Sequence, residues 1–330
     1  IYIPEGTVLT EDHLKLFGFG DEKKSKGMLS GSLGDRVKAI RLKGVISQGI
    51  IIPLTEGARD WAEHHNNDVS DFYNLKKYEP QVPTYMSGFL SKPKEKGEHY
   101  TYRHNYDIEN LKSYQNVLVE GEEVAITEKL HGTFFGICYV PGKEDAPFKD
   151  IFVFSKGLGR NGQMFSDVEA NRQNIYVKIY HQLEEKRLLN GLRGESLLGV
   201  ELATPIFLFG EIYGKGIQDL TYDTLPEVRF FDVHLGLWDS PGSTFLPFRD
   251  KIKFLQALNL PTVPLLYTGP YSKSLADELK EGQSSIASCI REGIVITPLQ
   301  ERRHHKLGRV ILKHVSEAYL TRKGEQTEYQ

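Results

Sequence analysis

The spacing between the predicted strands is the feature that most constrains how this chain can fold. Short apolar stretches rich in Val, Ile and Phe recur along the chain, and such stretches are typical of β-strands. They lie at residues 124–127, 134–140, 151–155, 206–212, 228–235, 293–297 and 309–313. Successive strands are often joined by too few residues for a crossover helix, which a parallel pair requires. The sheets are therefore predicted to be largely antiparallel, and the fold class to be α+β.

Two helices are predicted to flank these sheets. The longer helix covers residues 167–189, with Ser166 as its N-cap. Its apolar residues Ile175, Ile179 and Leu183 are spaced by four and therefore lie on one face. A weaker helical pattern covers residues 274–280.

The length of 330 residues is enough for two domains, each with its own core. A segment rich in Pro, Lys and Gly at residues 79–103 is the predicted linker between an N-terminal domain (1–78) and a C-terminal domain (104–330). The chain starts without Met, and its first residues have neither the basic nor the apolar region of a signal peptide. We therefore expect the N-terminal domain to be truncated at its start.

Residues 35–54 are predicted to form two strands with a break between them. Basic residues alternate with apolar ones in this segment, namely Arg36, Lys38, Arg41 and Lys43. Short strands of this kind suit a small β-barrel such as the OB-fold, which often binds nucleic acid on its sheet face. A basic, solvated strand face without a ligand is the alternative.

Composition excludes some classes of protein and leaves others open. Cys138 and Cys289 lie in apolar contexts, which indicates buried thiols in the cytoplasm or another reducing compartment. No apolar run approaches the roughly 18 to 20 residues that span a bilayer, so no membrane partner is expected. The net charge of −3 does not exclude nucleic acid, because basic residues can gather on one face.

One motif match is a decoy. Residues 157–162 read G-x-G-x-x-G after an apolar strand, as in dinucleotide-binding sites. The alternating strands and helices of such a site are missing, and a helix is predicted where its acidic strand end should lie. The chain also has no P-loop motif.

Lys129 follows an apolar strand, and Gly132 lets the backbone turn tightly three residues later. A lysine can act as a nucleophile only as a neutral amine, so desolvation or a nearby cation would have to lower its pKa. Taken alone, this K-x-x-G pattern is common and is more typical of a surface lysine before a turn.

Five more elements follow in a fixed order. They are Ser155-Lys156-Gly157, Gly210-Glu211, Phe230-Phe231-Asp232-Val233, Glu292-Gly293-Ile294-Val295 and a strand that ends in Lys313. Together with Lys129 they resemble the motif series of the covalent nucleotidyltransferases, the superfamily of ATP-dependent ligases and mRNA capping enzymes. Six short elements in the same order are far more specific than any one of them.

The details are similar to the Deinococcus-type branch of ATP-dependent RNA ligases, in which an OB domain precedes a nucleotidyltransferase domain. Most DNA ligases have Asp at the position of His131. Residues 35–49 and 313–320 carry the rest of the resemblance, which extends over nearly the whole chain. One departure is Ile311, which replaces the first lysine of a K-x-K pattern, so phosphate neutralisation would rest on Lys313 with help from Arg309 or Lys306.

The resemblance implies a three-step reaction. Lys129 attacks the α-phosphorus of ATP, AMP passes from the lysine to an RNA 5′-phosphate, and a 3′-hydroxyl then expels AMP. It implies that Glu292 holds the water ligands of Mg²⁺ or Mn²⁺, and that Glu211 binds the same metal shell or the ribose hydroxyls. It also implies that Phe231, or Phe230 in its place, stacks on adenine. The implied nucleotide-binding residues are Glu128, Leu130, Gly132, Lys156, Glu211, Phe231, Glu292 and Lys313. The implied role is RNA repair by a monomer that acts on RNA or on a nicked duplex that contains RNA.

Two alternatives remain. The chain could be a DNA ligase or a capping-type guanylyltransferase of the same superfamily, or a non-catalytic RNA-binding protein on a ligase scaffold. The intact motif series argues against the last. The run 301–306, Glu-Arg-Arg-His-His-Lys, is basic enough to contact a nucleic-acid backbone, with a mobile loop as the alternative.

Overall fold

The computed structural model describes residues 1–19, 29–30, 35–78, 102, 106–156, 164–194, 196–197, 200–201, 204–220, 222–237 and 240–322. The chain divides into two compact units, which are described separately. Unit 1 comprises Ile1–Pro80 and Glu317–Gln330, and unit 2 comprises Gln81–Ser316. Apart from Tyr102, the predicted linker lies outside the described residues, as does the G-x-G-x-x-G segment. In the described part of the chain, no helix is long and apolar enough to cross a membrane.

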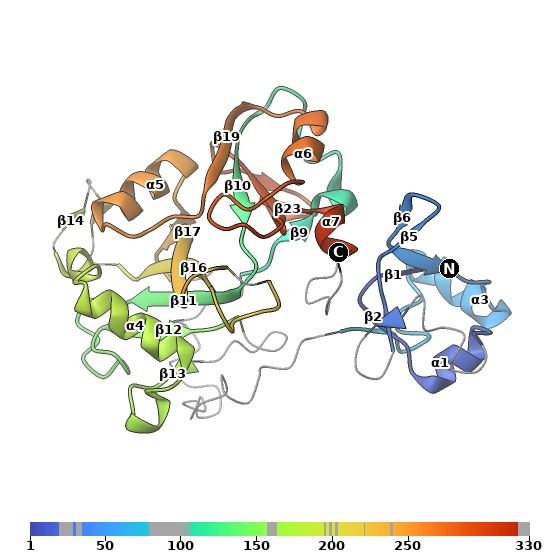
Figure 1. Ribbon diagram of the computed structural model, residues 1–330, viewed down its shortest axis with the longest axis horizontal. Coiled ribbons are helices and arrows are strands. Elements are labelled where there is room, and N and C mark those ends of the chain that lie inside the picture. Colours follow the sequence, from blue (N-terminus) through green and yellow to red (C-terminus); the bar gives the residue numbers. More distant parts are fainter. Residues whose placement is uncertain are drawn as a thin grey trace. The chain divides into compact units, whose positions relative to one another are not determined.

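Unit 2 contains two large sheets (Figure 1). The six-stranded sheet has the order β13-β12-β11-β16-β17-β18, and the five-stranded sheet has the order β19-β10-β20-β23-β9. All pairs are antiparallel except β23 with β9, so the prediction of largely antiparallel sheets is confirmed. The strands of the first sheet are β11 (Thr133–Tyr139), β12 (Ile151–Phe154), β13 (Met164–Phe165), β16 (Ile206–Tyr213), β17 (Glu227–Leu235) and β18 (Thr244–Phe245). Those of the second are β9 (Glu109–Asn110), β10 (Glu123–Lys129), β19 (Leu265–Pro270), β20 (Gly293–Pro298) and β23 (Leu312–Val315).

The two faces of the six-stranded sheet are buried against different partners. Side chains alternate between the faces of a strand, so neighbouring phenylalanines point in opposite directions. Phe135 packs in a core with α4 (Ile175–Glu185) and α5 (Phe248–Ala257). Phe134 lies on the other face, in a cluster that includes Val295 and Ile311 from the side of the five-stranded sheet. The two sheets therefore share an apolar contact, and the helices cover the far face of the first.

The helix starts differ from the predicted ones. The residue that caps α4 is Asn174, whose side-chain oxygen accepts a hydrogen bond from the backbone N–H of Tyr176. Ser166 as the N-cap is therefore wrong, because a short 3₁₀ helix, η4 (Glu169–Asn171), precedes the α-helix instead. The predicted second helix is α6 (Lys273–Leu279), capped by Ser272. Four further short elements belong to this unit: η3 (Leu111–Tyr114), η5 (Asn190–Arg193), β14 (Ser196–Leu197) and β15 (Val200–Glu201).

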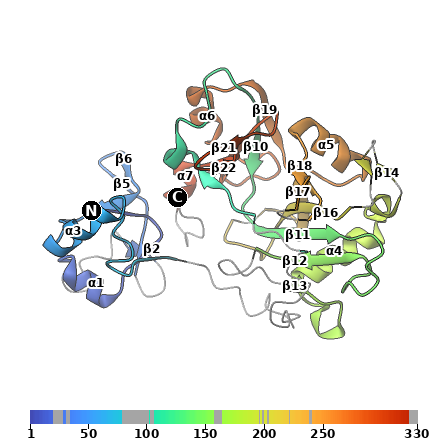
Figure 2. The ribbon, with the colours of Figure 1, turned by 180° about the vertical axis from the view of Figure 1, so that it is seen from behind.

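The predicted strand at 309–313 is split. A hairpin of β21 (Arg303–His304) and β22 (Gly308–Arg309) precedes β23 and is labelled in Figure 2. The backbone N–H of Val310 bonds to the carbonyl of Arg302 and closes the hairpin, so the chain joins the five-stranded sheet only at Leu312.

Unit 1 consists of short strands and helices. A four-stranded sheet has the order β3-β4-β2-β8, and β1 pairs with β7 and β5 with β6. The prediction of two strands over 35–54 is wrong, because Lys43 and Gly44 adopt positive φ and turn the chain sharply between β5 and β6. The described strands do not form a closed barrel, and the OB-fold stays a prediction. The elements are β1 (Tyr2–Pro4), β2 (Thr7–Val8), α1 (Glu11–Leu16), β3 (Leu29–Ser30), β4 (Arg36–Val37), β5 (Ile40–Leu42), β6 (Val45–Ser47), β7 (Gly49–Ile51), α3 (Glu56–His64), β8 (Lys76–Lys77) and α7 (Glu317–Leu320).

A buried carboxylate holds several elements of unit 2 together. Asp232 of β17 is fully buried and accepts hydrogen bonds from the Tyr106 hydroxyl (2.6 Å), from Arg309 of β22 (2.6 Å) and from Lys251 of α5 (3.1 Å). Burial alone would raise the pKa of Asp232, but Arg309 and then Lys251 outweigh it and lower the pKa to about 2. One carboxylate thus ties the six-stranded sheet to α5 and to the β21–β22 hairpin.

Replacement of Asp232 by Asn tests this tie. The loss of a fully buried anion leaves Arg309 and Lys251 without their shared partner, and we expect the free energy of unfolding to fall by about 3 to 5 kcal/mol. Because the pKa of Asp232 is lower in the folded state, its contribution is present above about pH 4 and is lost as the pH falls toward about 2. Denaturant titrations at several pH values measure both effects. Asp250→Asn on the exposed side of α5 is the control, and equal losses in the two variants would contradict the account.

Candidate functional site

The site is centred on an ion pair between two neighbouring strands. Lys129 is the last residue of β10 and lies opposite Gly293, the first residue of β20. Its Nζ donates a hydrogen bond of 2.6 Å to Oε1 of Glu292. The Glu292 side chain is fully buried, and that of Lys129 is 15% exposed. Sheet pairing thus brings together two predicted site residues that are 163 positions apart in the sequence.

The turn after Lys129 is held by the loop between β16 and β17. The Tyr222 hydroxyl accepts a hydrogen bond of 2.8 Å from the backbone N–H of His131, and Gln218 donates one of 3.2 Å to the carbonyl of Gly132. Burial raises the pKa of Tyr222 well above its usual range, so the hydroxyl stays neutral. No sequence pattern indicated a role for this loop, because none of its residues belongs to the motif series.

His131 lies between two carboxylates. Its Nε2 is 2.7 Å from Oδ1 of Asp219, and its Nδ1 is 4.0 Å from Oε2 of Glu292. The ring is almost completely buried. Its contact with Asp219 through Nε2 leaves Nδ1 as the nitrogen that faces Glu292. The histidine therefore connects the Lys129–Glu292 pair to a carboxylate that no sequence motif indicated.

Gly132 is required because there is no room for a side chain at this position, and not because of its backbone angles. A Cβ added at this position would collide with the carbonyl oxygen of Ile212 and would lie 2.9 Å from Cγ of Glu211. Glu211 therefore flanks the turn that follows Lys129. A Cβ at Gly293 would likewise collide with the carbonyl oxygen of His314, so β20 and β23 approach closely beside the ion pair.

Lys313 lies on the same face of the five-stranded sheet as Lys129. It pairs with Val295, two residues beyond Gly293, and side chains on alternate residues share a face. Glu128 lies on the opposite face, where its carboxylate accepts a hydrogen bond of 2.8 Å from the Ser285 N–H. The structure therefore brings Lys313 to the face of Lys129 but does not bring the Glu128 carboxylate there.

The other predicted residues of unit 2 are divided between the site and its surroundings. Leu130 is buried in an apolar cluster with Tyr222, which anchors the turn. Lys156 is half exposed and pairs with Asp107 at 3.0 Å. Arg309 is bound to Asp232 and Glu301, so the expectation that it helps neutralise substrate phosphates is wrong.

A β-bulge decides which phenylalanine faces the site. The pairing of β16 with β17 passes from Phe209 opposite Asp232 to Gly210 opposite Phe230, which leaves Phe231 as an extra residue. Phe230 is fully buried in the core with α4 and α5. Phe231 is partly exposed and packs near Phe134 on the opposite face, which is also the face of Glu211. Of the two candidates, Phe231 is the one beside the site.

The predicted metal ligands are only two carboxylates, those of Glu292 and Glu211. The described residues contain no group of three or more His, Cys, Asp or Glu side chains that could hold a metal ion by themselves. Glu292 and Glu211 lie on either side of the turn at His131 and Gly132. Mg²⁺ is usually bound by one or two protein carboxylates, with water and substrate phosphates as the other ligands. A pair of carboxylates fits that donor set.

The predicted nucleic-acid residues of unit 1 differ in exposure. The Arg36 side chain is 9% exposed and its guanidinium lies 3.6 Å from the centre of the Tyr78 ring, so it is not available to a phosphate. Arg41 is exposed and pairs with Glu317 at 3.2 Å. Lys43 is exposed and Lys38 is partly exposed.

The sequence model of the RNA ligase family matches residues 122–315. No curated protein matched the chain.

Several solved structures of the Naegleria gruberi RNA ligase are similar to the chain. A mutant with ATP and Mn has a TM-score of 0.67 and 21% identity, and the match covers 97% of this chain and 85% of that one. The protein with PPi, and another mutant with AMP and Mn, each have a TM-score of 0.68, 20% identity and the same coverage. At this identity the likeness establishes a shared fold.

Proposed function

The chain belongs to the RNA ligase family, and from this membership we propose that it joins RNA ends in an ATP-dependent reaction through an adenylyl-lysine at Lys129. The observation that carries the proposal is the buried Lys129–Glu292 pair at the end of β10, where the family's lysine motif lies. The Naegleria structures that hold ATP, AMP and PPi support ATP as the nucleotide substrate.

The reaction begins at the Lys129 amine. In the described state the Glu292 carboxylate, 2.6 Å away, stabilises the charged ammonium. The contact must open, and the lysine must lose a proton, before the nitrogen attacks the α-phosphorus of ATP. A P–N bond then forms and pyrophosphate leaves. AMP next passes to the 5′-phosphate of an RNA end, and the 3′-hydroxyl of the other end displaces AMP as the phosphodiester forms.

The surrounding side chains are assigned roles by their position. Negative charge builds up on the phosphate oxygens in each step, and Lys313, on the face of Lys129, lies where it can stabilise that charge. Mg²⁺ or Mn²⁺, held by Glu292 and Glu211 with water, would supply further charge neutralisation. The backbone of the turn at Leu130 and Gly132, and Lys156, two residues after the end of β12, complete the proposed nucleotide site.

Lys129→Ala tests the covalent step. With ATP and Mg²⁺ we expect no nucleotide to survive denaturation on the variant, because the attacking nitrogen is gone. The same variant should still join an RNA end that already carries AMP, since that step needs no adenylyl-lysine. Gel assays of nucleotide transfer and of sealing measure the two steps. The exposed Lys186→Ala variant is the control, and covalent AMP on the Lys129→Ala protein would rule out the assignment.

Phe231 is proposed to stack on adenine because the bulge turns it toward the site. Replacement by Ala removes a stacking contact worth about 1 to 3 kcal/mol. We therefore expect the KM for ATP in adenylylation to rise by about five- to 150-fold, with a smaller change in kcat. Phe231→Leu, which keeps apolar volume but not the aromatic face, should be closer to Ala than to wild type. An unchanged KM in both variants would place the base elsewhere.

Within the family we assign the chain to the Deinococcus-type branch, with unit 1 as an OB-type module that holds the polynucleotide. The exposed Lys43 and the partly exposed Lys38 support this assignment. The proposed substrate is RNA or a nicked duplex that contains RNA. A panel of nicked duplexes with RNA or DNA on either side of the nick would identify the preferred ends.

Lys38→Glu with Lys43→Glu tests the role of unit 1. We expect sealing of nicked RNA duplexes to fall and adenylylation by ATP to stay unchanged, because the motif series lies in unit 2. Wild-type sealing should weaken steeply as salt is added, since phosphate contacts release counterions. Unchanged sealing in the double variant would show that these lysines do not hold the substrate.

A further inference from the structure

No step of the proposed reaction uses the β21–β22 hairpin, residues 302–309, and Lys306, expected above to help neutralise phosphates, is exposed at its tip. Arg303 pairs with Arg309 and His304 with Gly308 across its two strands. It connects β20, which begins beside Glu292, to β23, which carries Lys313. Two strands of the five-stranded sheet that contribute to the site are therefore joined by this hairpin.

The base of the hairpin is fixed by two arginines. Arg302 donates to both carboxylate oxygens of Glu122, at 2.5 and 2.7 Å, and to the carbonyl of Val117 at 2.7 Å. Arg309 donates to both oxygens of Glu301, at 2.8 and 2.6 Å, and to Asp232 at 2.6 Å. Bidentate pairs of this kind hold a guanidinium in one orientation. The nearby carboxylates are thus occupied at the base and do not neutralise the tip.

The tip carries two cationic side chains, Arg303 and Lys306, with two histidines between them. Arg303, His305 and Lys306 are exposed, and His304 is partly exposed. The rings of the two histidines lie 4.3 Å apart. In the part of the chain that the structure describes, no carboxylate lies within 4.0 Å of Arg303 or Lys306. The whole chain has a net charge of −3, so this positive tip is a local feature.

We propose that the tip of this hairpin (Arg303, His304, His305 and Lys306) binds the phosphate backbone of the RNA substrate, away from the ends that are joined. The inference rests on the proposed function, since it assumes an RNA substrate. The side chains project from a hairpin, and exposed cations bind an extended polyanion better than a small anion because each phosphate contact releases counterions. Arg and Lys in such a position recognise phosphate rather than base sequence.

The strand geometry indicates which part of the RNA is bound. Gly293 lies opposite Lys129, and Pro298, where β20 ends toward the hairpin, is five residues further along. At about 3.4 Å per residue this separation is about 17 Å. For a duplex that runs along β20, with a rise of about 3.4 Å per nucleotide along the helix axis, the tip would reach phosphates about five or more nucleotides from the junction.

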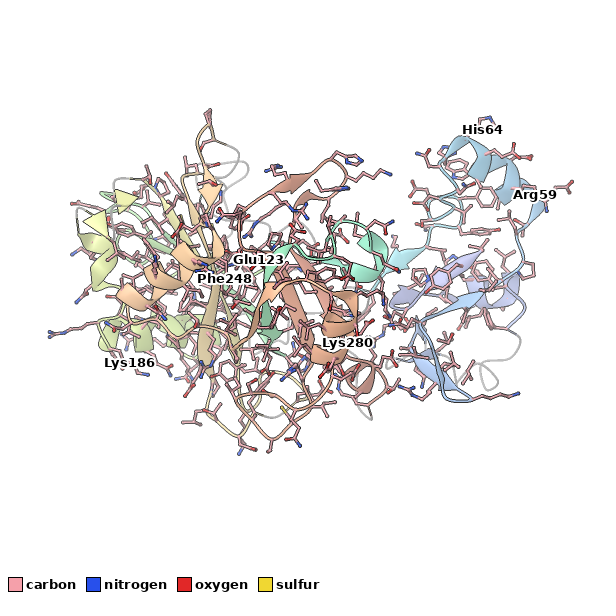
Figure 3. The ribbon with its side chains drawn as sticks, turned by 90° about the horizontal axis from the view of Figure 1, so that it is seen from above. Arg59, His64, Glu123, Lys186, Phe248 and Lys280 are labelled. Atoms are coloured by element: carbon pink, nitrogen blue, oxygen red, sulfur yellow. The ribbon has the colours of Figure 1, made fainter. Side chains whose placement is uncertain are left out.

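The test compares two double charge reversals in the full chain. Arg303→Glu with Lys306→Glu changes the tip. Lys178→Glu with Lys186→Glu is the matched control, because both lysines are exposed on or just after α4, which covers the far face of the six-stranded sheet (Lys186 is labelled in Figure 3). The dissociation constant for a nicked RNA duplex is measured over a salt series, and adenylylation by ATP is measured in parallel.

The tip variant should bind a long nicked duplex at least about tenfold more weakly than the control variant at roughly 100 mM salt. The slope of log affinity against log salt concentration should be smaller in magnitude by about 2, which is one for each lost phosphate contact. Adenylylation should match that of the wild type. On duplexes with arms shorter than about five nucleotides, the two variants should bind equally well, because the distant phosphates are absent.

Two results would overturn the inference. Equal affinity and equal salt dependence in the tip and control variants would show that the hairpin does not bind the backbone. A tip variant that is equally weakened on short arms would place the contact at the junction instead. Failure of the wild type to form covalent AMP is a separate outcome, which would contradict the proposed function and not the binding measurement.

Discussion

The structure of the site depends on one ion pair that forms only if two strands are in register. Lys129 ends β10 opposite the first residue of β20, so a shift of one residue would turn either side chain to the opposite face. Two glycines make the close approach possible, because a Cβ at Gly132 or at Gly293 would collide with a neighbouring backbone carbonyl. The buried Glu292 carboxylate then has the Lys129 ammonium 2.6 Å away. Register, glycine spacing and charge pairing thus impose the same geometry.

The remainder of unit 2 positions this pair between two sheets. The chain leaves the five-stranded sheet at Lys129 and enters the six-stranded sheet at Thr133, so the turn between them is part of both. The β16–β17 loop holds that turn through Tyr222, and Asp219 holds His131 toward Glu292. Asp232 ties the six-stranded sheet to the hairpin before β23, the strand of Lys313. The same contacts that stabilise the fold therefore also fix the Lys129–Glu292 pair and its surroundings.

Short-range patterns in the sequence predict the main strands of both sheets, and the order of the motifs assigns Lys129 and Glu292 to one site. The sequence does not show which of Phe230 and Phe231 faces the site. Strict alternation of side chains along a strand ignores the bulge that moves Phe231 to the face of Asp232. Helix α4 starts later than predicted, because Asn174 caps it and a 3₁₀ turn precedes it. The burial of Arg36 against Tyr78 depends on a tertiary contact, which a pattern of basic residues in a strand does not predict.

The central claim is that Lys129 becomes covalently bonded to AMP. The most direct test incubates the wild-type protein with ATP and a divalent metal, without RNA, and locates the added nucleotide by mass spectrometry of its peptides. A parallel incubation with GTP separates an ATP-dependent ligase from a capping-type enzyme. The account predicts AMP on Lys129 and no adduct with GTP. AMP on another residue, a GMP adduct, or no adduct under any metal would contradict it.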